Sequence, residues 1–212
     1  MKPIKEYIIE SLLDDEDDLV DSNDAIIRIF IEDNYEIGGS YTINDNIVDV
    51  QGNVIVKKDD IKSLTNGLFS FGVVSVDFNC EFCDSLKDLK GAPKEVRGNF
   101  DCAYCDSLKT LEGAPREVGR NFNCSHCRSL TSLEGAPREV GGCFDCSWCV
   151  FLKSLKGAPK KVGGYFGCND CRSLKTLEGA PKEVGGKFYC RNCRSLTSFK
   201  GIPQKVGGEI VH

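Results

Sequence analysis

Cysteine is the residue type in this sequence with the clearest capacity for chemistry. Thirteen cysteines occur among 212 residues, and Cys-x-x-Cys pairs are typical of structural zinc sites and of thiol redox centres. The pairs recur every 22 residues, so the cysteine content follows from repetition. Six such pairs begin at Cys80, Cys102, Cys124, Cys146, Cys168 and Cys190.

The placement of these pairs favours packing over metal binding. In an extended segment, residues alternate between two faces, which puts the first cysteine of each pair on the core side together with the preceding phenylalanine. Stacked strands lie about 4.8 Å apart, whereas sulfurs that share one zinc ion lie less than about 4 Å apart. Buried thiols pack as small hydrophobic groups. We therefore expect no metal site and no cofactor, with zinc binding and redox chemistry as the alternatives.

Cys143 stands outside the pairs and is expected to be the one exposed thiol, because it shares the outward parity of Asp145. A reactive cysteine needs a nearby base and a lowered pKa. Of the two histidines, His126 belongs to the exposed face of the neighbouring repeat, so a Cys–His encounter is the alternative to incidental exposure. No phosphate-binding loop, catalytic triad or paired-carboxylate motif is recognisable, so the chain is not expected to be an enzyme.

The repeat unit itself predicts a solenoid. Each unit is too small to bury its own apolar face, so neighbouring units must stack. The segment around each phenylalanine alternates as a half-buried strand does, and Gly157-Ala158-Pro159 then turns the chain. The unit is anchored by Phe78, Phe100, Phe122, Phe144, Phe166 and Phe188, which are spaced 22 apart.

The segment Val140 to Leu152 resembles the leucine-rich-repeat signature L-x-x-L-x-L-x-x-[N/C]-x-L. Phe144 and Cys146 stand at the strand leucines, Cys149 stands at the Asn/Cys position, and the last leucine arrives one residue late, as in cysteine-containing members. Gly141 departs from the pattern at the first leucine. The short unit resembles bacterial repeats, and its G-A-P-[KR]-E-V-G-G phrase looks like that of uncharacterised repeat proteins of tailed bacteriophages. The resemblance implies a leucine-rich-repeat solenoid with a parallel β-sheet on a concave face and extended or 3₁₀ returns.

The chain is expected to divide into four parts. An acidic N-terminal cap of two short helices and a strand covers residues 1–52, with helices expected around 4–12 and 25–31. A degenerate first repeat follows at 53–77, then six 22-residue repeats at 78–209 and a truncated terminal strand at 210–212. The run of five acidic residues at 14–18 is interpreted as a solvated helix end or linker, because it lacks the spacing of a calcium loop.

The distribution of charge and of apolar residues bears on where in the cell the protein is expected to be. Residues 1–60 carry 16 acidic and 5 basic residues, whereas the rest of the chain carries 16 acidic and 22 basic residues. No apolar run approaches the ~20 residues of a membrane span, and the N-terminal residues lack the features of a secretory signal. We expect a cytoplasmic protein, in the host cytoplasm if it is encoded by a phage, with no membrane partner.

The residues that break the repetition are the candidate binding residues. The position before the second cysteine is aromatic or histidine in four successive units, and the position after it changes from acidic to basic along the array. Exposed aromatic residues beside arginine are typical of binding hot spots. The predicted partner-binding residues on the concave strand face are Phe82, Tyr104, His126, Trp148, Arg128, Arg172, Arg194 and Tyr189.

These features favour a non-enzymatic protein-binding module, with a phage-encoded inhibitor of a host defence protein as one form of it. A virion or other structural interaction protein is an alternative. A nucleic-acid-binding solenoid is another, because rings and arginines could hold bases and phosphates. Aspartates such as Asp84 and Asp106 on the same face oppose the nucleic-acid interpretation.

Overall fold

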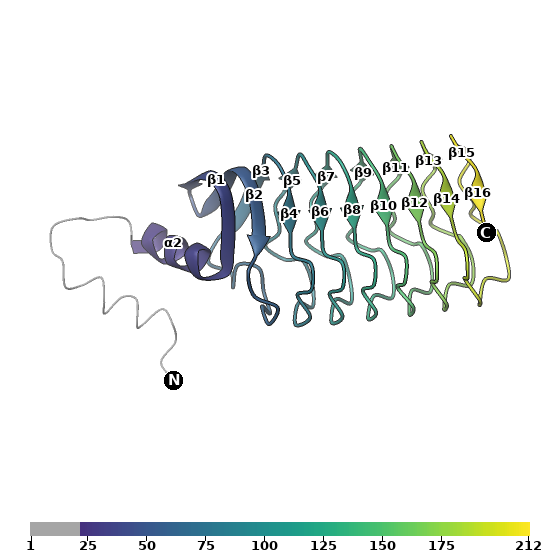
Figure 1. Cartoon of the computed structure of the whole chain (residues 1–212), viewed down its shortest axis with the longest axis horizontal. Coiled ribbons are helices and arrows are strands. Elements are labelled where there is room, and N and C mark those ends of the chain that lie inside the picture. Colours follow the sequence, from purple (N-terminus) through teal and green to yellow (C-terminus); the bar gives the residue numbers. More distant parts are fainter. Residues whose placement is uncertain (1–21) are drawn as a thin grey trace.

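The computed structural model describes residues 22–212 as a parallel β-solenoid of about eight turns behind one helix (Figure 1). We call each full turn a rung and name it after its inward phenylalanine, from rung 78 to rung 188. The first row of strands, the phenylalanine row, contains one two-residue strand from each rung, with a longer strand before them and one further strand after them. It consists of β2 (Ile47–Val56), β4 (Phe78–Asn79), β6 (Phe100–Asp101), β8 (Phe122–Asn123), β10 (Phe144–Asp145), β12 (Phe166–Gly167), β14 (Phe188–Tyr189) and β16 (Ile210–Val211).

A second row, the valine row, is formed by the returns. Its strands pair in parallel with Glu95 opposite Glu117 and Val96 opposite Val118, and the register repeats along the array. Since β2 pairs with both β3 and β4, it joins the two rows into one 16-stranded sheet. The valine row consists of β3 (Ser70–Val74), β5 (Glu95–Val96), β7 (Glu117–Val118), β9 (Glu139–Val140), β11 (Lys161–Val162), β13 (Glu183–Val184) and β15 (Lys205–Val206).

The second row corrects the expectation of a concave face. A concave face needs one side of the array to be shorter than the other. Here strands stack on both sides with the same interstrand spacing, and the rungs follow one another along a straight axis (Figure 1). Within the described residues the returns combine turns with the two-residue strands of the valine row and contain no 3₁₀ helix. The solenoid and its parallel strands are confirmed; the leucine-rich-repeat identity stays a prediction.

The interior is a set of columns that run along the solenoid. Each phenylalanine ring stacks on the next, and for Phe122 and Phe144 the centroids lie 5.2 Å apart with planes 4° apart. The leucines and valines line the rest of the interior, as Leu152 and Val162 do in rung 144. Because every rung is filled in the same way, the core is continuous from the cap to the last rung.

Two kinds of glycine allow the rungs to stack. Gly157 has a φ of 91°, so the turn before Pro159 uses a conformation that favours glycine. Gly163 has no such φ, but a Cβ there would lie 2.0 Å from the carbonyl oxygen of Gly141 in the preceding rung. This corner therefore needs glycine because two backbones approach each other closely.

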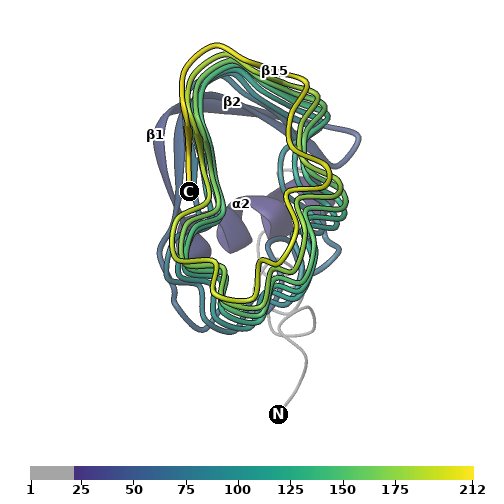
Figure 2. The same ribbon diagram turned by 90° about the vertical axis from the view of Figure 1, so that its right-hand side faces the viewer.

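The N-terminal end of the array is closed by α2 (Ser22–Asn34) and by β1 (Tyr35–Asn44), which pairs antiparallel with β2. In the end view, α2 lies across the interior of the coil (Figure 2). Ile27 and Ile31 are buried against the core, and the Tyr35 hydroxyl donates to the Leu64 carbonyl. The expected boundary between residues 52 and 53 falls inside β2, because the cap and the first rung share this strand.

Two expectations lie outside the described residues: the helix around residues 4–12 and the acidic run at 14–18. Within residues 22–212, no helix is long and apolar enough to cross a membrane.

Candidate functional site

The Cys-x-x-Cys pairs lie inside the solenoid in two columns. The first cysteine of each pair follows the inward phenylalanine, as Cys146 follows Phe144, and both are fully buried. In the last five rungs the second cysteine donates its S–H to the carbonyl of the first cysteine in the preceding rung, as Cys149 does to Cys124 at 3.2 Å. Burial raises the pKa of thiols such as Cys124 and Cys146, which holds them in the neutral form. The thiols thus satisfy backbone carbonyls within an apolar core.

The described residues contain no group of three or more His, Cys, Asp or Glu side chains placed to hold a metal ion. All thirteen cysteines are free thiols in the structure.

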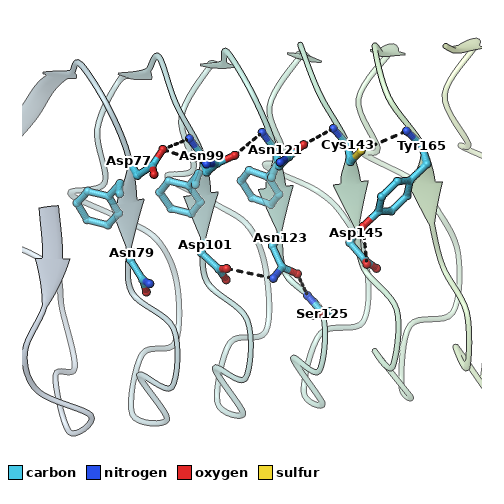
Figure 3. A pocket seen from close by; sticks show the side chains of 13 residues that line it. Asp77, Asn79, Asn99, Asp101, Asn121, Asn123, Ser125, Cys143, Asp145 and Tyr165 are labelled. Atoms are coloured by element: carbon cyan, nitrogen blue, oxygen red, sulfur yellow. Dashed lines mark hydrogen bonds between the residues drawn. The ribbon is translucent and has the colours of Figure 1, made fainter. Parts of the chain in front are cut away.

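Cys143 is half-buried and belongs to a ladder of side chains along the start of the phenylalanine row (Figure 3). Its backbone N–H donates to Asn121 Oδ1 at 2.8 Å, and its Sγ accepts from the Tyr165 N–H at 3.4 Å. The predicted exposed thiol is thus partly covered, because its sulfur takes the place that the Asn99 and Asn121 amide oxygens have in the two preceding rungs. His126 lies beyond the end of the same row of strands, so the structure does not bring it to the Cys143 sulfur.

The ladder runs through consecutive rungs. Asp77 Oδ1 accepts from the Asn99 N–H at 2.6 Å, and Asn99 Oδ1 accepts from the Asn121 N–H at 3.1 Å. Each side chain thereby bonds the backbone of the rung that follows it. Asn and Asp residues at the position before the phenylalanine in the first three rungs were the sequence signal for this ladder, and the sequence interpretation did not use it.

A second polar column follows the phenylalanine in the first four rungs. Asp101 Oδ1 accepts from the Ala103 N–H at 2.9 Å and Asp145 Oδ1 from the Ser147 N–H at 2.8 Å, and the same bond ends each of these four strands in an Asx turn. The Tyr165 hydroxyl donates to Asp145 Oδ2 at 3.3 Å. Burial, with Asp145 as the next cause, raises the pKa of Tyr165 to about 12. Between the ladder and this column lies a shallow groove of about 410 Å³ (Figure 3).

The predicted aromatic residues form one column, which we call the aromatic column: Phe82, Tyr104, His126 and Trp148. Their ring centroids lie 4.8, 4.3 and 5.4 Å apart in sequence order, with the planes within 20° of parallel. The exposed fractions are 51% for Phe82, 37% for Tyr104 and 40% for Trp148. Burial, followed by the charge of Arg128, lowers the pKa of His126.

The backbone of this column corrects the strand-face expectation. Each of its residues has a positive φ, from 58° at Tyr104 to 64° at Trp148, so the rings project from a left-handed corner after the strand. Asp170 and Asn192 occupy the same corner in the last two rungs with a φ of 57°. Asp and Asn adopt this conformation more readily than aromatic residues do. The rings therefore stand at a backbone position where another residue type is favoured.

The charged column lies beside the aromatic column. Arg128 Nε is 3.9 Å from Asp106 Oδ1 in the preceding rung, and the Arg172 guanidinium lies 5.7 Å from the centroid of the Trp148 ring. Arg194 is exposed in the last full rung. Arg128 and Arg172 therefore lie beside the aromatic column, and their role in binding stays a prediction.

Tyr189, the remaining predicted residue, lies apart from the corner. It sits on β14 in the column that follows the phenylalanines, and its ring meets that of Tyr165 edge-on at 5.8 Å. It therefore packs against Tyr165, which lines the groove, and lies outside the aromatic column.

No family model matches this sequence, and comparison with curated proteins and with solved structures gives no match.

Proposed function

We propose that the chain is a non-enzymatic protein-binding module. Its binding surface is the front face, which we define as the outward side chains of residues 77–84 and of the equivalent residues in the five rungs that follow. The observation that supports this proposal is the aromatic column. It places three large rings, each more than a third exposed, in one line beside Arg128 and Arg172. Tyrosine, tryptophan and arginine dominate the energetics of protein interfaces.

The arrangement of the rings favours a protein over a nucleic acid. Each inner ring has both faces covered by its neighbours, as the His126 ring does between Tyr104 and Trp148. Bases bind single-strand platforms by stacking on free ring faces, whereas this column offers ring edges. Ring edges suit the faces of other aromatic side chains and apolar groups of a protein.

The test separates binding from folding. Trp148→Asn removes the ring and introduces a residue type suited to the left-handed corner, as Asn192 shows at the equivalent position of rung 188. We expect this variant to melt close to the wild type and to lose at least about thirty-fold in affinity for a bound protein, the effect of removing a hot-spot ring. Lys161→Ala, on the exposed side of the valine row, is the matched control. Full affinity in Trp148→Asn would move the site away from the aromatic column.

Membership in the leucine-rich-repeat class is part of the proposal. The 22-residue period and the placement of Cys149 support it, whereas the second row of strands departs from the resemblance. A phage-encoded inhibitor of a host protein and a virion component are the two forms of binding module that the resemblance suggests. Identification of the protein bound by the wild type, and lost in Trp148→Asn, would distinguish them.

Nucleic-acid binding is the second candidate, and the basic end of the front face favours it. Lys187, Arg191 and Arg194 share rung 188 with no acidic residue on the same face. Binding of this kind would weaken steeply with salt, in proportion to the number of phosphates neutralised. An oligonucleotide titration at two salt concentrations tests it.

A further inference from the structure

The charges of the front face are ordered along the solenoid. Rung 78 contributes Asp77, Glu81 and Asp84 with no basic residue, and rung 100 contributes Asp101 and Asp106. At the other end, rung 188 contributes three basic residues and no acidic one. The face is therefore acidic near the cap and basic near the last rung. The basic residues of rung 188 are Lys187, Arg191 and Arg194.

The opposite charges also occupy matching columns. Asp84 and Arg194 are equivalent positions of their rungs, and so are Glu81 and Arg191. Asp106 and Arg172 are the equivalent pair one rung further in. Reversing the direction of the array thus exchanges acidic for basic residues without moving any column sideways.

From this order we infer that the front face binds the front face of a second copy of the chain, with the two solenoids antiparallel. The two-fold axis lies between the faces, at right angles to the solenoid axis, midway between β8 and β10. Rung 78 then faces rung 188 of the partner, and rung 100 faces rung 166. This inference rests on the proposed function, because it names the protein that the front face binds.

The centre and the size of the face suit such a pair. Near the axis, rung 122 faces rung 144, so the exposed Trp148 ring of one copy meets the His126 position of the other and supplies apolar contact. Six rungs at about 4.8 Å and eight residues of at most about 3.3 Å give a face no larger than roughly 29 by 26 Å, because the chain turns at residue 82 and its equivalents. This upper limit of about 750 Å² is close to the ~800 Å² per partner of a standard interface.

Charge then sets the direction of pairing. In a parallel pair the two-fold axis would run along the solenoid and each rung would face its own copy with the columns exchanged, which would place Asp84 against Asp77 and Arg194 against Lys187. Like charges opposed at an interface disfavour that arrangement strongly, whereas exposed opposite pairs fix orientation more than they add affinity. Lys187 already lies 2.8 Å from Glu209 of its own chain. Asp84 and Arg194 are therefore the better pair to test.

The test is a charge exchange followed by sedimentation or light scattering, with the monomer mass of 23.3 kDa as the reference. We expect the wild type to reach twice that mass. Asp84→Arg alone and Arg194→Asp alone should each weaken self-association at least about tenfold, because each places like charges at both ends of the pair. Both residues are exposed, and circular dichroism checks that the variants fold.

A double variant and a mixture of the two single variants make the test specific. The double variant Asp84→Arg/Arg194→Asp should dimerise again, and the two single variants mixed together should form a heterodimer. If the front face bound a different protein, whose charges the substitutions leave unchanged, the double variant would bind less well than either single variant. A wild type that stays monomeric at about 1 mM, or a dimer unaffected by the single changes, would overturn the antiparallel pair. In either case the Trp148→Asn measurement still decides the proposed function separately.

Discussion

The His126 imidazole lies flat against the Tyr104 ring, with the centroids 4.3 Å apart and the planes 9° apart. The two residues are 22 positions apart, so one period of the sequence becomes one layer of a ring stack. The same stacking continues to Phe82 on one side and to Trp148 on the other. The aromatic column therefore contributes to the cohesion of the rungs as well as to the surface.

Truncating a ring of the aromatic column should cost less stability than truncating a ring of the inner phenylalanine column. Phe144→Ala removes a fully buried ring from between Phe122 and Phe166, and we expect it to cost ~3–5 kcal/mol in unfolding free energy. Trp148→Ala removes a partly exposed ring and one stacking partner, for a loss of ~0.5–1.5 kcal/mol. Urea unfolding of both variants measures the difference. Equal losses would mean that the exposed column is as much a part of the core as the inner one.

His126 should lower the stability of the folded protein as the pH falls below neutral. Burial and then Arg128 lower its pKa in the folded state, whereas the unfolded chain keeps a value of about 6.5. The unfolded chain therefore takes up this proton first as the pH falls. The stability associated with neutral His126 is present above pH ~6.5 and is lost as the pH falls from there toward the folded pKa. His126→Asn should lose less stability than the wild type between pH 7.5 and pH 5 in urea titrations. An identical loss in both proteins would show that His126 does not titrate differently on folding.

Gly163 should be intolerant of any side chain. A Cβ there would meet the Gly141 carbonyl oxygen at 2.0 Å, and both atoms belong to backbones fixed by strand pairing. We expect Gly163→Ala to cost more than the ~1–3 kcal/mol of ordinary overpacking. Gly67→Ala is the control, because no atom lies within 4 Å of a Cβ at Gly67, although its φ of 72° adds its own strain. A melting temperature for Gly163→Ala near that of the wild type would contradict the close approach of the rungs.

The sequence predicted the solenoid because its strongest signals are local and repeated. Phe144 and Cys146 alternate with Asp145, which is the pattern of a half-buried strand, and the structure buries the first two. The valine row was missed because Glu139–Val140 contributes only two strand residues, too few to show any alternation. The left-handed corner was missed because Trp148 belongs to a residue type that rarely adopts a positive φ. The period of the sequence predicts which residues share a column, but it does not predict the backbone conformation at those residues.

Cys143 should be the first thiol to react in the folded protein. It is half-buried, whereas the other twelve cysteines are buried, and burial raises the pKa of core thiols such as Cys102 and Cys124. The Tyr165 N–H donates to its sulfur, so reaction should be slower than for a free thiol. Brief alkylation followed by mass spectrometry should give one main adduct, which Cys143→Ser removes. Fast modification of several paired cysteines would contradict their inward placement.

The most direct test of the front face is site-specific photocrosslinking in cells. A benzophenone amino acid in place of Phe82, which is 51% exposed, puts the probe at the end of the aromatic column without entering the core. The same probe at Lys161 tests the exposed side of the valine row. We predict protein adducts from position 82 and none from position 161, with a second copy of the chain among the adducts. Equal yields at both positions, or adducts from position 161 alone, would contradict a binding surface on the front face.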